Sequence, residues 1–214
     1  MAPGLSRTHP TGSTFIRLLA DLACAETGDS KQTFAERLSG WLDWTDAIAL
    51  SAALNGAETP VAAADRPGKG AKTASVFAAC KRVRAELVRA ITAEGADAET
   101  TADLTASRRW YVGHQRTMTE RIGVLRADVR QALSNRSPAL ARLAALDAVF
   151  DEALAARERH LLSQVPALLE QRFEQLRSAP DGAATYGRDM QRVLLAELDI
   201  RLQPIEGMME ALGQ

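Results

Sequence analysis

The chain has 214 residues, of which 46% are hydrophobic and 5% aromatic, and its 26 basic side chains nearly balance its 27 acidic ones. This length can bury a core without disulfides or metals, and the near-neutral balance excludes a protein that is strongly charged over its whole surface. Much of the apolar fraction is Ala and Leu, which favour helices, and runs of alternating β-branched and aromatic residues are missing. The composition therefore predicts an all-α protein.

Residues 1–12 carry no apolar stretch typical of a secretory signal, and no part of the chain approaches the roughly 20 apolar residues of a membrane span. We expect a disordered tail over residues 1–12 and a cytoplasmic protein. The two cysteines, Cys24 and Cys80, lie in Ala-rich helical patterns. That setting favours buried thiols over a disulfide or a metal pair.

Two amphipathic segments predict an N-terminal helical hairpin over residues 13–55. The first helix is expected over residues 13–24, where apolar residues recur at spacings of three and four. The second is expected over residues 33–55. It begins at a capping box in which Thr33 and Glu36 satisfy each other's backbone N–H groups.

Residues 56–72 are rich in Gly, Pro and Ala, which predicts a flexible linker. The end of this linker, residues 68–73, has some likeness to a phosphate-binding loop. Ala71, however, occupies the place of the second glycine, and no strand precedes the loop. We therefore interpret it as linker, and we expect a third helix over residues 73–94.

A long central helix is predicted from Asp103 to Asn135. Its apolar residues fall on one face: Tyr111, Met118, Ile122, Leu125, Val129 and Leu133. Such a stripe needs another helix to cover it. Ser137 and Pro138 then supply the N-cap and the first-turn proline of the next helix.

The helical pattern after Pro138 continues to Leu176 but contains Pro166. A proline inside a helix removes one backbone hydrogen bond and clashes with the preceding turn, so we expect either a kink near Leu162 or two helices in series. A turn at residues 180–182 precedes a final helix over residues 184–212. Joined by short loops, the long helices of residues 73–214 are predicted to form an antiparallel bundle or a coiled-coil-like hairpin.

No motif of an established catalytic centre occurs in the sequence. The three histidines, His9, His114 and His160, lack the partner spacing of a helix-borne zinc site. We therefore expect a non-enzymatic protein with no cofactor and no metal.

Trp41 and Trp44 lie three residues apart and would share one face of the predicted second helix, flanked by Asp43 and Asp46. Such a pair is usually a core anchor, and the alternative is an exposed surface that docks a protein partner. These four residues are the candidate partner-binding site.

Eight arginines between Arg108 and Arg142 accompany only two acidic residues, an excess of six positive charges. Pairing with carboxylates of the following helix explains this pattern. Those carboxylates are Asp147, Asp151, Glu152 and Glu158. The alternative is a nucleic-acid surface, which the neighbouring Trp110 and Tyr111 would suit. Its candidate contacts are Arg108, Arg109, Arg116, Lys69 and Lys72.

Two N-terminal segments, TGSTFIRLLADL at residues 11–22 and FAERLSGWLDWTDAI at residues 34–48, resemble an uncharacterised bacterial domain-of-unknown-function family. The family has no assigned activity, so the resemblance implies no catalytic residues. It implies an accessory role beside envelope proteins similar to proton-channel stators and to OmpA-like peptidoglycan binders. We expect a helical interaction or scaffold protein whose partners are proteins, in a homo-oligomer or an envelope-associated complex.

Overall fold

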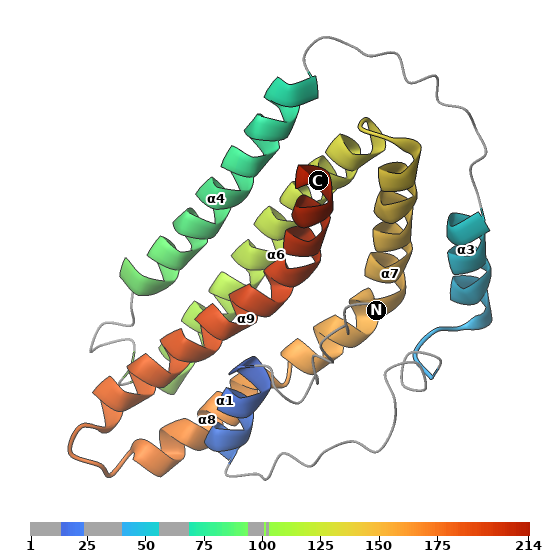
Figure 1. The fold of residues 1–214 in the computed structure, drawn as a ribbon. Helices are drawn as coiled ribbons and strands as arrows, with labels where there is room; N and C mark the ends of the chain where they lie inside the picture. Colours follow the sequence, from blue (N-terminus) through green and yellow to red (C-terminus); the bar gives the residue numbers. More distant parts are fainter. Residues whose placement is uncertain (1–13, 24–39, 56–68, 94–100, 102) are drawn as a thin grey trace, which may run out of the picture.

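The computed structural model describes residues 14–23, 40–55, 69–93, 101 and 103–214 (Figure 1). All regular structure in these ranges is α-helical, which confirms the predicted all-α class. The helices are α1 (Thr14–Ala23), α3 (Trp44–Asn55), α4 (Lys69–Ala93), α6 (Leu104–Ser134), α7 (Pro138–Leu162), α8 (Val165–Leu176) and α9 (Gly182–Gly213). None of them is both long enough and apolar enough to cross a bilayer.

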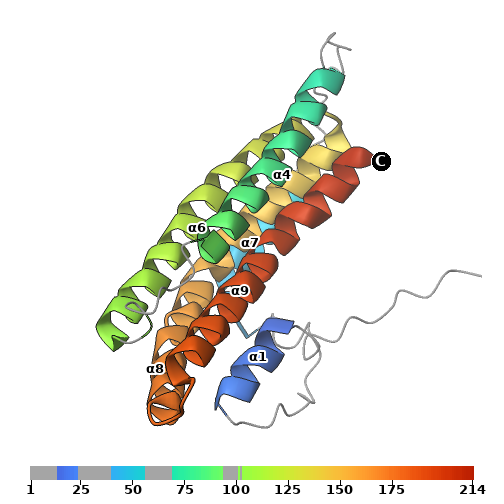
Figure 2. The same ribbon diagram turned by 90° about the vertical axis from the view of Figure 1, so that its left-hand side faces the viewer.

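The long helices form an up-and-down bundle with a parallel pair at its centre. Helix α6 contacts α4, α7, α8 and α9. Tyr111 and Thr119 of α6 bond to Glu197 and Arg201 of α9, so residue numbers rise together along both helices and the two are parallel. Helix α4 lies on one side of this pair and the α7–α8 arm on the other, each running in the opposite direction (Figures 1 and 2). The predicted bundle forms, rather than a hairpin.

Helix α6 follows its sequence signals closely. The Asp103 side chain caps its N-terminus by accepting from the backbone N–H groups of Thr105 and Ala106, and Asn135 is the C-cap. The predicted apolar stripe is buried and extends by two polar residues, Ser107 and His114, at the same helical spacing. The core between α6 and its neighbours therefore contains polar groups that need partners.

Pro166 divides the α7–α8 arm into two helices in series, one of the two outcomes that the sequence predicts. Helix α7 starts as expected, with the Ser137 hydroxyl accepting from the N–H of Leu140, and ends at Leu162. Helix α8 begins at Val165, so Pro166 falls in its first turn, where a missing N–H leaves no bond unmade.

The turn between α8 and α9 depends on a glycine. A Cβ on Gly182 would lie 2.0 Å from the carbonyl oxygen of Leu176, so any other residue would force the turn apart. Helix α9 starts at this glycine, two residues before the predicted position. It continues through Pro204 to Gly213 and buries the predicted apolar face.

The two short helices within the predicted N-terminal hairpin, residues 13–55, pack on different helices of the bundle. Helix α1 packs on α8 and α9 with Phe15 and Leu22 buried, whereas α3 packs on α7 (Figures 1 and 2). Each short helix thus covers a different part of the bundle. Local periodicity predicts that a helix needs a partner surface, but it does not specify which one.

The second predicted helix also starts later than expected. Residues 40–43 are not helical, and α3 begins at Trp44. The N–H of Asp46 donates to Asp43 Oδ1 at 2.8 Å, and the N–H of Asp43 donates to Asp46 Oδ2 at 3.0 Å. This reciprocal capping starts the helix, because it satisfies two N–H groups that have no partner within the helix. Thr33 and Glu36 lie outside the described residues.

Helix α4 begins at Lys69, so the last four residues of the predicted linker 56–72 are helical; residues 56–68 lie outside the described ranges, as do residues 1–12. Cys80 on α4 is a half-buried free thiol rather than a fully buried one, and Cys24 lies outside the description.

We predict that Ile122→Asp and Leu125→Asp unfold the bundle, because both side chains are buried between helices and an unpaired buried charge costs several kcal/mol. Arg116→Ala should change stability by about 0 to 1 kcal/mol, because Arg116 is 82% exposed and its ion pair is with Glu120, one turn away on the same surface. Thermal unfolding followed by circular dichroism compares them. Equal melting temperatures for the three variants would show that the stripe is not core.

Candidate interaction surface and interhelical polar clusters

A fully buried carboxylate, Glu197 of α9, collects polar groups from two helices. The Tyr111 hydroxyl donates to Glu197 Oε2 at 2.8 Å, and the Gln115 amide donates to the same oxygen at 3.0 Å. Arg201, one turn along α9, donates to Glu197 Oε1 at 2.9 Å through Nε. We call Tyr111, Gln115, Glu197 and Arg201 the Glu197 cluster.

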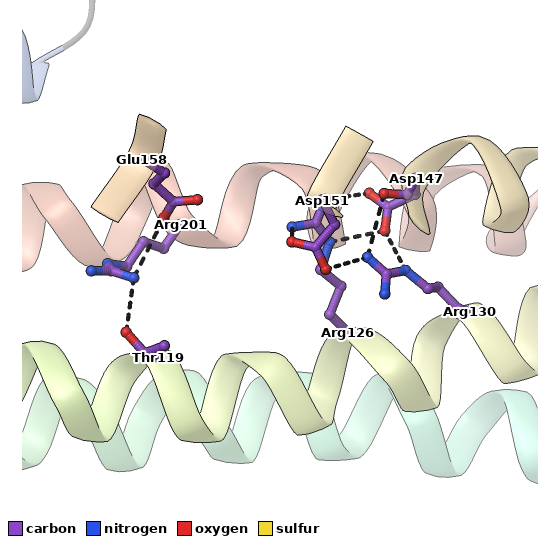
Figure 3. Close-up of polar contacts among 7 residues, drawn as sticks. All are labelled: Thr119, Arg126, Arg130, Asp147, Asp151, Glu158 and Arg201. Atoms are coloured by element: carbon purple, nitrogen blue, oxygen red, sulfur yellow. Dashed lines mark hydrogen bonds and ion pairs between the residues drawn. The ribbon is translucent and has the colours of Figure 1, made fainter. Parts of the chain in front are cut away.

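The Glu197 cluster also reaches the α7–α8 arm. Arg201 donates to Thr119 of α6 at 3.1 Å and to Glu158 of α7 at 3.4 Å (Figure 3). The Gln115 amide donates to the carbonyl of Leu162, the last residue of α7, at 3.2 Å. Because α7 ends at Leu162, its carbonyl has no N–H donor from a following helical turn. The Gln115 amide supplies a donor in its place. The cluster therefore joins α6, α7 and α9 at one level.

A second polar cluster consists of Arg126 and Arg130 of α6 with Asp147 and Asp151 of α7 (Figure 3). Each arginine pairs with both carboxylates at 2.6 Å, in a partly buried setting. Burial opposes the charged form of Arg130, but hydrogen bonds to the two carboxylates outweigh it and raise the pKa of this guanidinium. This cluster fixes α7 against α6.

The basic candidates for nucleic-acid contact are not brought together. Arg116 pairs with Glu120, and Arg121 pairs with Glu86 of α4. Arg108 and Arg109 are exposed near the start of α6, and the ion pairs found in the described ranges do not include them. Lys69 and Lys72 belong to the first turn of α4, which runs opposite to α6 and so begins at the other end of the bundle (Figure 1).

The aromatic residues beside Arg108 and Arg109 do not form a stacking platform. Tyr111 is buried in the Glu197 cluster, and Trp110 is half-buried with its ring edge-on to His114, 4.4 Å between ring centroids. His160 is exposed at the end of α7, and His9 lies outside the described ranges. Among the residues that the structure describes, no group of three His, Cys, Asp or Glu is placed to hold a metal ion.

The predicted tryptophan pair is divided between two environments. Because α3 begins only at Trp44, the two indoles do not share a helix face, which corrects the sequence interpretation. Trp41 is half-buried, with the Arg157 guanidinium of α7 4.5 Å from its ring centroid, a cation–π contact that anchors the segment. Asp43 and Asp46 cap the helix. Trp44 is 81% exposed, and it alone of the four presents an open apolar side chain.

The structure adds two further residues to Trp44. Ile48 is 56% exposed and Leu54 is 57% exposed. Ala49, Leu50 and Ala53 are half-buried on the opposite side, where α3 packs on α7. We call Trp44, Ile48 and Leu54 the α3 face. It was not predicted: the sequence pattern placed residues 33–55 in one helix of a hairpin and distinguished neither Ile48 nor Leu54.

The fold and these contacts define a helical bundle protein whose polar side chains mainly hold helices together and whose short helix α3 exposes three large apolar side chains, Trp44, Ile48 and Leu54. A family model described as a protein of unknown function, DUF3348, matches residues 1–214, and the chain belongs to this family. The predicted resemblance is thus confirmed. No curated protein and no solved structure matches the chain.

We predict that Glu197→Ala lowers the free energy of unfolding by about 3 to 5 kcal/mol, because it leaves the buried Tyr111 hydroxyl without its acceptor and removes the ion pair between Glu197 and Arg201. Glu197→Gln keeps the shape and should lose less. Asp199→Ala is the matched control, since Asp199 is an exposed acid on the same helix that pairs with Arg84. Urea denaturation measures all three, and a loss for Glu197→Ala no larger than for Asp199→Ala would contradict the role assigned to the cluster.

We also predict that stability falls as the pH rises from about 10 to 12. Burial raises the pKa of Tyr186 to about 12, with a smaller rise from Glu170 and an opposing hydrogen bond from Ser107. Burial, followed by the Glu197 charge, raises the pKa of Tyr111. An unfolded tyrosine ionises near pH 10, so above that pH the unfolded chain releases protons that the folded one retains. Denaturation at stepped pH should show a flatter decline for the Tyr111→Phe/Tyr186→Phe variant.

Proposed function

We propose that this chain is a non-enzymatic helical interaction protein that docks an apolar helix of a second protein chain, of its own or a different sequence, on the α3 face. The observation that carries the proposal is the two-sided character of α3. Its inner residues pack on α7, while Trp44, Ile48 and Leu54 remain open on the other side. A surface helix normally has one apolar stripe and a polar opposite face.

The composition of the α3 face supports a protein partner. Trp is the residue most often found at the centre of protein interfaces, since it buries a large area at a low cost in side-chain entropy. The two carboxylates beside it, Asp43 and Asp46, would repel a phosphate backbone. Such a protein would suit the accessory role in an envelope complex that the family resemblance implies.

The ion pairs of the bundle weaken the alternative function in nucleic-acid binding. Among the eight arginines between Arg108 and Arg142, Arg116 and Arg121 pair with carboxylates at the surface, and Arg126 and Arg130 do so in a partly buried cluster. Arg126 and Arg130, the two in the partly buried cluster, are held by carboxylates and contribute little to the release of counterions from phosphates, which is the main source of non-specific affinity for nucleic acid.

The test is site-specific photocrosslinking in the cell of origin. A photoreactive amino acid replaces Trp44 in one variant and Val124 in the control, because Val124 is another exposed apolar residue, on α6. We expect one discrete protein adduct from position 44, lost when Ile48→Asp is added, and none from position 124. No adduct at position 44, or the same adducts at both positions, would overturn the proposal.

Fluorescence anisotropy with generic DNA and RNA tests the alternative. At about 150 mM salt we expect weak binding or none. Nanomolar binding with a steep salt dependence, lost in the Arg108→Ala/Arg109→Ala/Arg116→Ala variant, would replace the proposed function by the nucleic-acid one.

A further inference from the structure

The outward side of α3 carries no charged side chain over its whole length. Besides the apolar residues of the α3 face, the exposed positions of α3 are Thr45, Ala47, Ser51, Ala52 and Asn55, all of them uncharged. The only acids of the segment, Asp43 and Asp46, are confined to its N-terminal end, where they cap the helix. Two such surfaces can therefore meet without burying a charge.

We infer that the occupant of the α3 face is a second copy of this chain, with the two α3 helices packed antiparallel about a two-fold axis near Ala49 and Leu50. This inference rests on the proposed function and names its partner. Helix α3 is then internal, with its own α7 on one side and the second α3 on the other. Both of its apolar sides are explained by one arrangement.

The antiparallel direction follows from charge. A parallel pair would place the Asp43 and Asp46 carboxylates of both copies side by side. In the antiparallel pair these groups lie at opposite ends of a 12-residue helix, about 18 Å apart. That separation exceeds the screening length of about 8 to 10 Å at physiological salt, so the repulsion is largely removed.

The same arrangement matches large side chains to small ones. With the axis between Ala49 and Leu50, Trp44 of one copy faces Asn55 of the other, and Ile48 faces Ser51. Large residues opposite small ones interdigitate, as in the cores of helix bundles. Such a contact is isologous, because each copy uses the same residues, which is the commonest form of homodimer.

The size of the surface predicts a weak, reversible dimer. Two helices of about 18 Å bury less than the roughly 1,200 Å² at which stable interfaces begin. The association should therefore depend on concentration in the micromolar range and reverse on dilution.

Sedimentation velocity of the full chain from about 1 to about 200 µM tests the inference. We expect the mass to rise from 23.1 kDa towards twice that value. Ile48→Asp and Ile48→Lys should each remain monomeric across the range, because each places two like charges near the axis. An equimolar mixture of the two should dimerise again, which a folding defect would not allow. Val124→Asp, on an exposed site of α6, should behave as the unaltered chain does.

Each result decides between the two proposals. A monomer at every concentration, or a dimer that persists in both Ile48 variants, overturns the second copy as occupant. If position 44 still crosslinks to a different protein, the proposed function stands and only this inference fails. If position 44 crosslinks to nothing, both fail. An adduct at position 44 of twice the chain's mass, together with recovery in the mixture, supports both.

Discussion

The buried Glu197 carboxylate is the constraint on which the arrangement of the long helices depends. An ionised side chain with no exposure is tolerated only when its oxygens are fully bonded, and its partners come from α6 and from the next turn of α9. Sliding α9 along α6 by one turn would leave a charge without partners. Apolar stripes alone allow such slips at little cost, so the carboxylate selects one register.

The polar contacts that fix the register at Glu197 also reach the break between α7 and α8. Gln115 donates both to Glu197 and to the carbonyl at the end of α7, so one amide relates the position of α9 to the place where the α7–α8 arm divides. Further along, the Arg126 and Arg130 pairs with Asp147 and Asp151 hold the middle of α7. The arm is thus fixed by polar contacts at two levels, with apolar packing between them.

Local signals in the sequence predict the elements but not their pairing. The ends of α6, the division at Pro166 and the buried face of α9 follow from capping residues, proline and periodicity, which act within a few residues. The docking of α1 and α3 depends on surfaces far away in the chain. The sequence does not predict that Glu197 is buried and bonded between helices, because its partner Tyr111 is 86 positions away. The Asp43–Asp46 capping pair was readable in principle, and it would have placed the start of α3 correctly.

Helix α3 is held to the bundle more weakly than the long helices are. No residue of α3 is buried, so its docking on α7 depends on half-buried side chains and on the Arg157 contact with Trp41. A short helix held in this way is marginal by itself. Any partner that binds only the docked helix stabilises the docked state by mass action. Docking of α3 on α7 and binding at its outer face are therefore thermodynamically coupled.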